Sequence, residues 1–459
     1  MSVAGSLAGE VVRIAELPVE ELPWQGIGSV LVDTLAAACA GAGAPSAEAA
    51  RREIGLPAGR ARVWGTADRT DAIQAALVNG IAAHVLELDD IYAPGTVHPG
   101  SVVIPAALAV ADEVEASGTA LARAVAAGYE VCGRISADLG PSHYRNWHTT
   151  GTGGAVGAAA AAALLLAGGG PVDAATVQSS LALAATMSGG LQQLFRSDAS
   201  GKPLHAGHGA MAGVIAAKTA RAGIGGAADI FEGPAGMGVA MGGSGRWTHS
   251  TSATGGFVID ASTIKPYPCC GHSFAAVDGA LQLRGQLGSA PLDAVERVRV
   301  DTYRAGIEVA GIAVPASAAD TRFSIPFLVA LALADGTIDR AELTPSRLDD
   351  PAFKAVVATT EVRLDDELEA AFPANRGARV TVTTTDGRTL VAFVPNRSGS
   401  PESPLSPEAL RSKYDGLLSH VTQQERDRLH TQLVDLSGVA RSSALALPDS
   451  LRPITSEEV

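Results

Sequence analysis

A long stretch without a charged residue, residues 149–172, constrains the fold of this chain more than any other feature. It contains six consecutive alanines, Ala158–Ala163, followed by three leucines. The stretch is long enough to cross a bilayer, but alanine is only weakly hydrophobic and three glycines at Gly168–Gly170 interrupt it. Alanine is also the best helix former. We therefore expect a helix buried among other helices of the protein rather than a membrane span.

A similar composition, rich in small apolar residues, extends over most of the first 264 residues. Alanine and glycine dominate the segments between short connections rich in glycine, proline and serine, so the helix axes can approach closely. A hydrophobic content of 47% and a charged content of 18% are typical of a packed globule. Apolar residues at helical spacing predict helices over 29–40, 71–88, 101–113, 120–138, 154–166, 174–187 and 206–222.

The pattern changes near Lys265. Residues 295–311 and 378–395 alternate apolar and polar side chains, and the second segment contains a hairpin signal at Asp386-Gly387. A helical pattern lies between them at 325–334. The fold class predicted is mainly α, a large all-helical domain with an inserted smaller α+β lid domain. Its parts are 1–264 (helical), 265–396 (α+β) and 397–459, a linker and C-terminal helices that return to the helical domain.

Charge and cysteine content narrow the partners and the compartment. A net charge of −14 argues against nucleic acid or an anionic membrane as a partner. Four cysteines, two of them adjacent at Cys269 and Cys270, make no disulfide framework and fit a cytoplasmic protein. The first residues include Glu10 and no sustained apolar core, unlike a signal peptide.

Two segments place histidines beside helix starts. In "HVLELDDIYAPGTVHPGS" a predicted helix ends in a run of acids that includes Glu87 and Asp90, and a loop with His98 follows. In "SHYRNWHTTGTGG" His148 precedes a turn whose free N–H groups could bind a carboxylate. The alternative for the first segment is that the acids are solvated and His98 is a plain loop residue. The alternative for the second is that His148 only caps a helix. The glycines of that turn lack the preceding strand that a dinucleotide fingerprint needs.

Two further segments carry lysines. "GKPLHAGH" places Lys202 ahead of a helix expected to begin near Ala206, and "IKPYPCCGHS" supplies Lys265 and His272. The paired histidines of the first segment lack a third ligand at recognisable spacing, so we expect no metal. The four quoted segments hold two of only five lysines and seven of ten histidines in an acidic protein. Such a gathering of cations and neutral bases predicts a small polycarboxylate substrate.

Together these fragments resemble the MmgE/PrpD family, which includes 2-methylcitrate dehydratases, cis-aconitate decarboxylases and an iminodisuccinate epimerase. "ALVNGIAAHVLELDD", "HTTGTGGAVGAAAAAALLL", "KPLHAGH", "KPYPCCGHS" and "PLSPEALRSKY" occur in the family's order and cover nearly the whole chain. The resemblance implies a helical domain built from both chain ends, an inserted lid, a homodimer, an active site in the interdomain cleft, and no metal or organic cofactor.

The resemblance also implies roles for individual residues. It assigns His98, His148 and Lys202 to catalysis, and Glu87, Asp90, Lys265 and His272 to substrate binding. Departures from the decarboxylase branch are Glu87 in place of Asp, Ile91 in place of Thr, a longer loop before His98, and Cys270 in place of His. The roles of His205 and His208 are left open.

We expect a cofactor-independent lyase, with dehydration of a hydroxy acid of the 2-methylcitrate type as the first hypothesis. Decarboxylation and epimerisation use the same carbanion chemistry and are the alternatives. A non-catalytic acid-binding protein is the alternative of another class.

Overall fold

The computed structural model describes residues 2–196, 199–252, 255–289 and 291–449, and these fall into two units. The first unit combines the chain up to Ile264 with the chain from Pro407 onward, and the second unit is Lys265–Ser406. The second unit thus extends to Ser406, beyond the predicted end at 396. The last ten residues of the predicted C-terminal segment, 450–459, lie outside the described residues.

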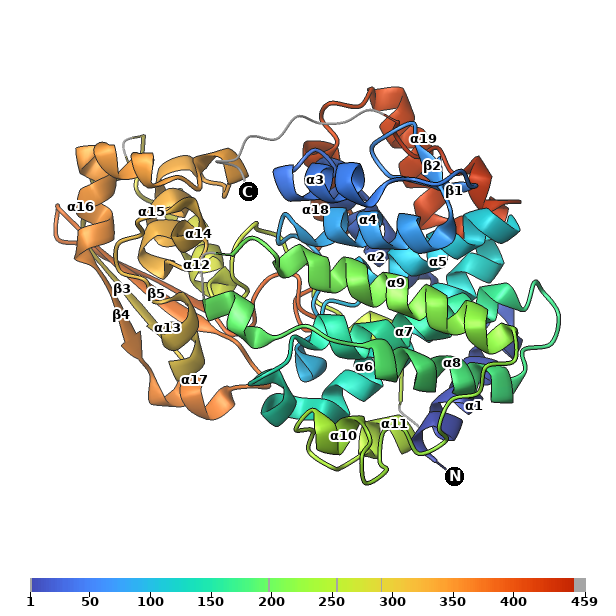
Figure 1. Cartoon of the computed structure of the whole chain (residues 1–459). Coiled ribbons are helices and arrows are strands. Elements are labelled where there is room, and N and C mark those ends of the chain that lie inside the picture. The colour runs from blue at the N-terminus through green and yellow to red at the C-terminus, as the bar shows by residue number, and fades with distance from the viewer. Residues whose placement is uncertain (1, 197–198, 253–254, 290, 450–459) are drawn as a thin grey trace. The chain divides into compact units, whose positions relative to one another are not determined.

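The first unit is built almost entirely from helices (Figure 1). Its one small sheet in the described residues is the antiparallel pair β1 (Ala61–Arg62) and β2 (Arg69–Thr70). The longer helices are α1 (Val3–Glu16), α2 (Trp24–Gly41), α3 (Pro45–Ile54), α4 (Ala72–His84), α5 (Gly100–Val114), α6 (Gly118–Tyr144), α7 (Thr149–Leu166), α8 (Ala174–Met187), α9 (Lys202–Arg221), α18 (Pro407–Leu417) and α19 (Gln423–Val434).

Helix α7 is the centre of this unit and packs against α5, α6, α8 and α9 (Figure 1). By length and composition it could cross a membrane, but every one of its residues is buried inside the unit, which confirms the prediction of a buried helix. Small residues make this packing possible. A Cβ added to Gly213 of α9 would lie 2.5 Å from the Cβ of Ala158 on α7, and one added to Gly157 would lie 2.6 Å from the carbonyl oxygen of Gly128 on α6.

Three predicted helix boundaries near the polar segments are wrong. Helix α7 begins at Thr149 rather than at Gly154. Helix α9 begins at Lys202 rather than near Ala206, because Pro203 occupies the first turn, where its missing N–H has no cost. Helix α4 ends at His84 rather than Leu88. The chain then turns through Glu87, whose φ of 57° is left-handed and incompatible with a continued helix.

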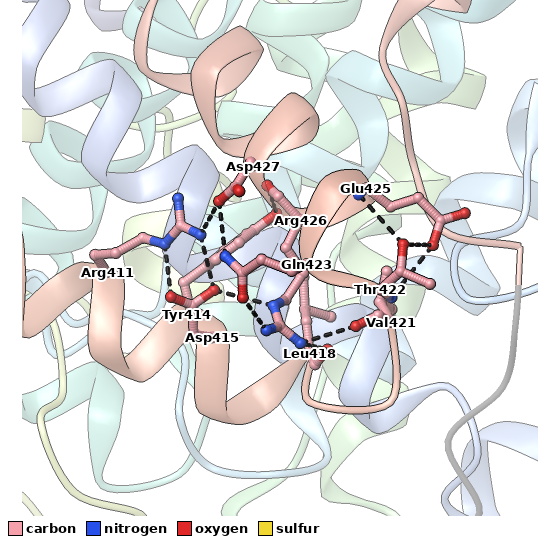
Figure 2. Close-up of polar contacts among 10 residues, drawn as sticks. All are labelled: Arg411, Tyr414, Asp415, Leu418, Val421, Thr422, Gln423, Glu425, Arg426 and Asp427. Carbon is pink, nitrogen blue, oxygen red and sulfur yellow. Dashed lines mark hydrogen bonds and ion pairs between the residues drawn. The ribbon is translucent and has the colours of Figure 1, made fainter.

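The C-terminal helices pack against α2, so segments from the two ends of the chain lie together. A polar network fixes α18 to α19 (Figure 2). The Arg411 guanidinium binds Asp415 at 2.7 Å and also reaches Asp427, while Thr422 and Glu425 form a capping box at the start of α19. This network holds in place the helix that carries Lys413.

The second unit is α+β. Its sheet has four strands in the order β4 (Thr360–Leu364), β3 (Val295–Thr302), β5 (Ala378–Thr384) and β6 (Thr389–Val394). Strands β3 and β4 are parallel and the other neighbours are antiparallel. The hairpin predicted at Asp386-Gly387 joins β5 to β6. The predicted strand over 295–311 is wrong in its second half, which forms helix α13 (Arg304–Ala310). Helix α12 packs on β5 and β6, and α15 packs on α12. The main elements are α12 (Phe274–Arg284), β3 (Val295–Thr302), α15 (Ile325–Asp335), α16 (Pro351–Thr359), β4 (Thr360–Leu364), β5 (Ala378–Thr384) and β6 (Thr389–Val394).

Candidate active site

Four histidines from separate elements of the first unit converge. His84 is the last residue of α4, His98 lies in the loop before α5, His148 is the N-cap residue of α7, and His205 lies in the first turn of α9. The ring centroid of His84 lies 4.9 Å from that of His98 and 5.6 Å from that of His148. The ring centroids of His148 and His205 are 5.4 Å apart. The fold thus brings together the two histidines predicted as catalytic, and it adds two others.

Asp89 lies between two of these rings and is fully buried. Its Oδ2 is 2.7 Å from His84 Nδ1, a hydrogen-bond distance, and 3.4 Å from His98 Nδ1. A carboxylate on Nδ1 fixes the orientation of an imidazole and directs its Nε2 to the opposite side. No role for His84 or Asp89 was predicted from the sequence. The sequence feature that could have identified them is their position in the same short segment as Glu87 and His98.

His148 is held as a neutral base. Burial lowers its pKa well below the usual value, and the neighbouring His84 and Lys202 lower it further. Burial and His84 also lower the pKa of His205. The Nδ1 atoms of His148 and His205 are 3.2 Å apart, so one ring donates the hydrogen bond and the other accepts it. His148 caps α7 through its backbone position alone, since its side chain makes no capping bond.

Lys202 places a positive charge beside these rings. As the first residue of α9 it forms an ion pair with Glu87, and both side chains are about one-quarter exposed. Its Nζ also lies 5.6 Å from the ring centre of Phe195, which in turn packs edge-on against His148 at 4.9 Å. A carboxylate ligand would meet the lysine here in competition with Glu87.

Asp90 lies beneath the site and is fully buried. Its Oδ1 accepts the backbone N–H of Gly100 at 2.8 Å, which ties it to the start of α5, two residues after His98. Burial raises the pKa of Asp90 to about 8, with further contributions from the Asp33 and Asp89 carboxylates. Asp90 therefore helps to hold the start of α5, and the substrate contact predicted for it stays a prediction.

Lys413 connects this acidic loop to the C-terminal helices. It forms an ion pair with Asp33 and donates a hydrogen bond to the carbonyl oxygen of Leu88 at 2.9 Å. Because α18 is fixed by the network of Figure 2, the lysine holds the loop that carries Glu87 and Asp89.

Lys265 and His272 belong to the second unit. Lys265 is only 3% exposed. The His272 Nδ1 lies 2.8 Å from the Tyr303 hydroxyl, and burial, followed by the charges of two arginines, lowers the His272 pKa to about 3. Their roles in substrate binding stay predictions. Cys269 is a buried core residue whose thiol pKa is raised well above its usual value by burial, as expected of a packing residue.

His84, Asp89 and His98 are also the residues best placed to hold a metal ion among those that the structure describes. Their potential ligand atoms all lie within 4.8 Å of one another. Two imidazoles and a carboxylate suit zinc or iron(II). The distance between His84 and Asp89 is equally that of a hydrogen bond, and the expectation of a metal-free site stays a prediction.

Comparisons with known proteins cover nearly the whole chain. Residues 11–250 match the MmgE/PrpD N-terminal domain and residues 267–436 the MmgE/PrpD C-terminal domain. Cis-aconitate decarboxylase of Homo sapiens is 25% identical over 368 residues, covering 77% of this chain and 74% of the relative. The cis-aconitate decarboxylase-like protein oryM of Aspergillus oryzae is 26% identical over 474 aligned residues, covering 96% of each. Cis-aconitate decarboxylase of Aspergillus terreus is 24% identical over 407 residues, covering 81% and 79%. The two family models span both units, and on that ground the chain belongs to the MmgE/PrpD family.

Proposed function

We propose that this protein is a cofactor-independent lyase that decarboxylates a small unsaturated polycarboxylic acid of the cis-aconitate type. The observation that carries the proposal is the convergence of His98, His148 and Lys202 in one unit: the charges of Lys202 and His98 both act on His148, and Asp89 contacts His98. The names of the relatives favour decarboxylation, which the sequence analysis ranked second, over dehydration, which it ranked first.

The chemistry requires a cation and a proton donor. When the carbon–carboxylate bond breaks, CO2 leaves and the electron pair stays on the substrate, delocalised toward a remaining carboxylate. A positioned cation lowers the barrier to forming this charge. Lys202 supplies that cation in the proposal, and substrate replaces Glu87 as its partner.

A proton must then be delivered to carbon. His98 suits this step because Asp89 contacts its Nδ1 and leaves Nε2 to face the substrate. The new C–H bond uses the electron pair left by CO2, and the imidazole regains its proton from water. The buried His148 stays neutral in this reaction and serves as a hydrogen-bonding partner of the substrate.

Dehydration is the second candidate, and one observation favours it. A dehydratase needs a neutral base to take a proton from carbon while the hydroxyl leaves as water, and the lowered pKa of His148 keeps its ring unprotonated and able to accept a proton. In that reaction His98 would donate the proton to the leaving hydroxyl.

Turnover of an acid panel in D2O, followed by NMR, tests the proposal. The panel contains cis-aconitate, citrate, 2-methylcitrate and aspartate-derived dicarboxylates. Decarboxylation releases bicarbonate and introduces one deuterium at carbon, dehydration gives new alkene carbon signals without bicarbonate, and epimerisation exchanges a Cα hydrogen only. A His148→Asn preparation controls for copurifying enzymes. Ligand signals that shift without product in every arm would overturn the proposal in favour of an acid-binding protein.

A further inference from the structure

A large apolar cavity opens beside the histidines in the first unit. Its volume is about 680 Å³, which lies in the range of small-molecule sites. Most of its wall is aliphatic, and the residues that supply it are Leu77, Leu191, Leu194, Leu204 and Met211. Leu191 and Leu204 are 57% and 50% exposed, unusually high for leucines that face a common hollow. The cavity thus offers unfilled hydrocarbon surface to a ligand.

The cavity and the candidate active site share His205. This ring lines the cavity and also lies with its Nδ1 3.2 Å from His148 Nδ1. Gly190, in another part of the cavity wall, is also linked to His148, because His148 donates its backbone N–H to the Gly190 carbonyl oxygen at 2.9 Å. A Cβ added to Gly190 would lie 3.0 Å from the His205 ring. Position 190 must therefore be glycine if the His205 ring is to keep its place.

The few polar groups of the cavity carry no net charge. Burial lowers the pKa of both His205 and His208, so both rings are neutral at pH 7, and Gln193 is uncharged. A carboxylate gains no ion pair from this wall, whereas a hydrocarbon group loses its contact with water. Lys202 supplies a positive charge two residues before Leu204 on the same helix.

We propose that this cavity binds an apolar substituent of the substrate while the acid head group lies at Lys202 and the histidines. The substrate class is then an alkyl-substituted di- or tricarboxylic acid rather than an unsubstituted one. This inference rests on the proposed function for the position of the head group.

Binding of a graded ligand series tests the inference directly. Succinate and its 2-methyl, 2-butyl and 2-hexyl derivatives are titrated into the full-length protein by calorimetry. Each methylene group that enters the cavity should tighten binding by roughly fourfold or less, the value for complete removal from water. Leu204→Asp places a charge at the cavity wall and should make the affinity nearly independent of chain length. Ile224→Asp is the matched control, since Ile224 is an equally exposed aliphatic residue (53%) outside the cavity, and should keep the chain-length dependence.

Three outcomes would overturn the inference. They are affinity independent of chain length in the wild type, an unchanged dependence in Leu204→Asp, and a halved particle mass of Leu204→Asp in solution. The last outcome would make the hollow an interface between two copies of the chain. Because the assay measures binding, a protein that turns over no acid but binds longer chains more tightly would refute the proposed function alone.

Discussion

The two ends of helix α9 carry the same kind of ion pair in different surroundings. At the N-terminal end Lys202 pairs with Glu87, with side chains 24% and 22% exposed. At the C-terminal end Lys218 pairs with Glu113, with side chains 26% and 31% exposed, and donates to both carboxylate oxygens. Geometry and exposure therefore do not distinguish the pairs. The first pair lies beside Phe195, which packs on the buried, neutral His148. These neighbours, rather than the ion pair itself, make the N-terminal end the candidate reaction site.

Removing an imidazole from the first end should have the largest effect. His98→Asn and His148→Asn should each lower kcat/KM on the order of a hundredfold or more, since each removes a group that transfers or positions a proton. The loss in the double variant should be smaller than the product of the two single losses, because the groups act as a unit. Steady-state kinetics on the substrate found in the acid panel measures these losses.

The matched control is His249→Asn, which changes an exposed histidine of the same unit. It should keep full activity and melting temperature. If instead His98→Asn and His148→Asn melt at lower temperature and keep near-normal rates, both histidines only support the neighbouring helix starts.

Neutralising the two lysines compares the ends of α9 directly. Lys202→Gln should lower kcat/KM by about 10–100-fold, the equivalent of a charged hydrogen bond worth about 1.5–3 kcal/mol. Lys218→Gln should leave kcat/KM unchanged. Both variants should lose less than about 1 kcal/mol of unfolding free energy, because partly exposed ion pairs contribute little.

Chemical denaturation and kinetics on both variants measure these effects. Equal activity losses at the two ends would contradict the assignment of Lys202 to the site. A large stability loss confined to Lys202→Gln, with normal turnover, would make that lysine structural.

Composition and periodicity predicted the helical unit well because its signal is local. A segment of continuous alanine and leucine has few alternatives to a buried helix; α8 has the predicted bounds, and α7 ends where predicted but begins at Thr149 rather than at Gly154. Two other errors occur where one residue overrides the pattern. Pro203 begins α9 early, and the left-handed turn at Glu87 ends α4 early. Apolar periodicity predicts neither of these helix boundaries.

The site was less predictable than the fold because its members are distant in sequence. The resemblance supplied His98, His148 and Lys202. The pairing of His84 with Asp89 depends on how the chain turns after α4, and the ring contact of His148 with His205 depends on how α7 and α9 pack. The buried position of Asp90 likewise depends on its bond to Gly100, which sequence spacing alone does not specify.

The unfolding free energy of the protein should depend on pH through Asp90, which lies in the loop between α4 and α5. Its pKa is about 8 in the folded protein, against a usual value of 3.8, so between these values the folded state holds a proton that the unfolded state has released. Stability therefore falls as pH rises through this range. Asp90→Asn does not titrate, and its amide oxygen can still accept the Gly100 N–H. The variant should gain on the order of 2 kcal/mol relative to wild type between pH 6 and pH 8.

Urea denaturation at pH 6, 7 and 8 measures this difference. Asp173→Asn is the control, because Asp173 is an exposed N-cap whose pKa is lowered by Thr176 and is ionised throughout this range in both states. A constant difference between wild type and Asp90→Asn across the three pH values would show that Asp90 is ionised in the folded protein.

Chelation should have the smallest effect of all, although one end of α9 lies near groups able to bind an ion. A single proton between His84 Nδ1 and Asp89 satisfies both groups at 2.7 Å, and the same carboxylate contacts His98. We expect activity to survive prolonged dialysis against a chelator and elemental analysis to find no stoichiometric metal. One ion per chain that is absent from His84→Asn and present in His249→Asn would instead identify His84, Asp89 and His98 as ligands. In that case the acid group of the substrate would bind to the metal ion, since a catalytic zinc commonly has three protein ligands and an open position.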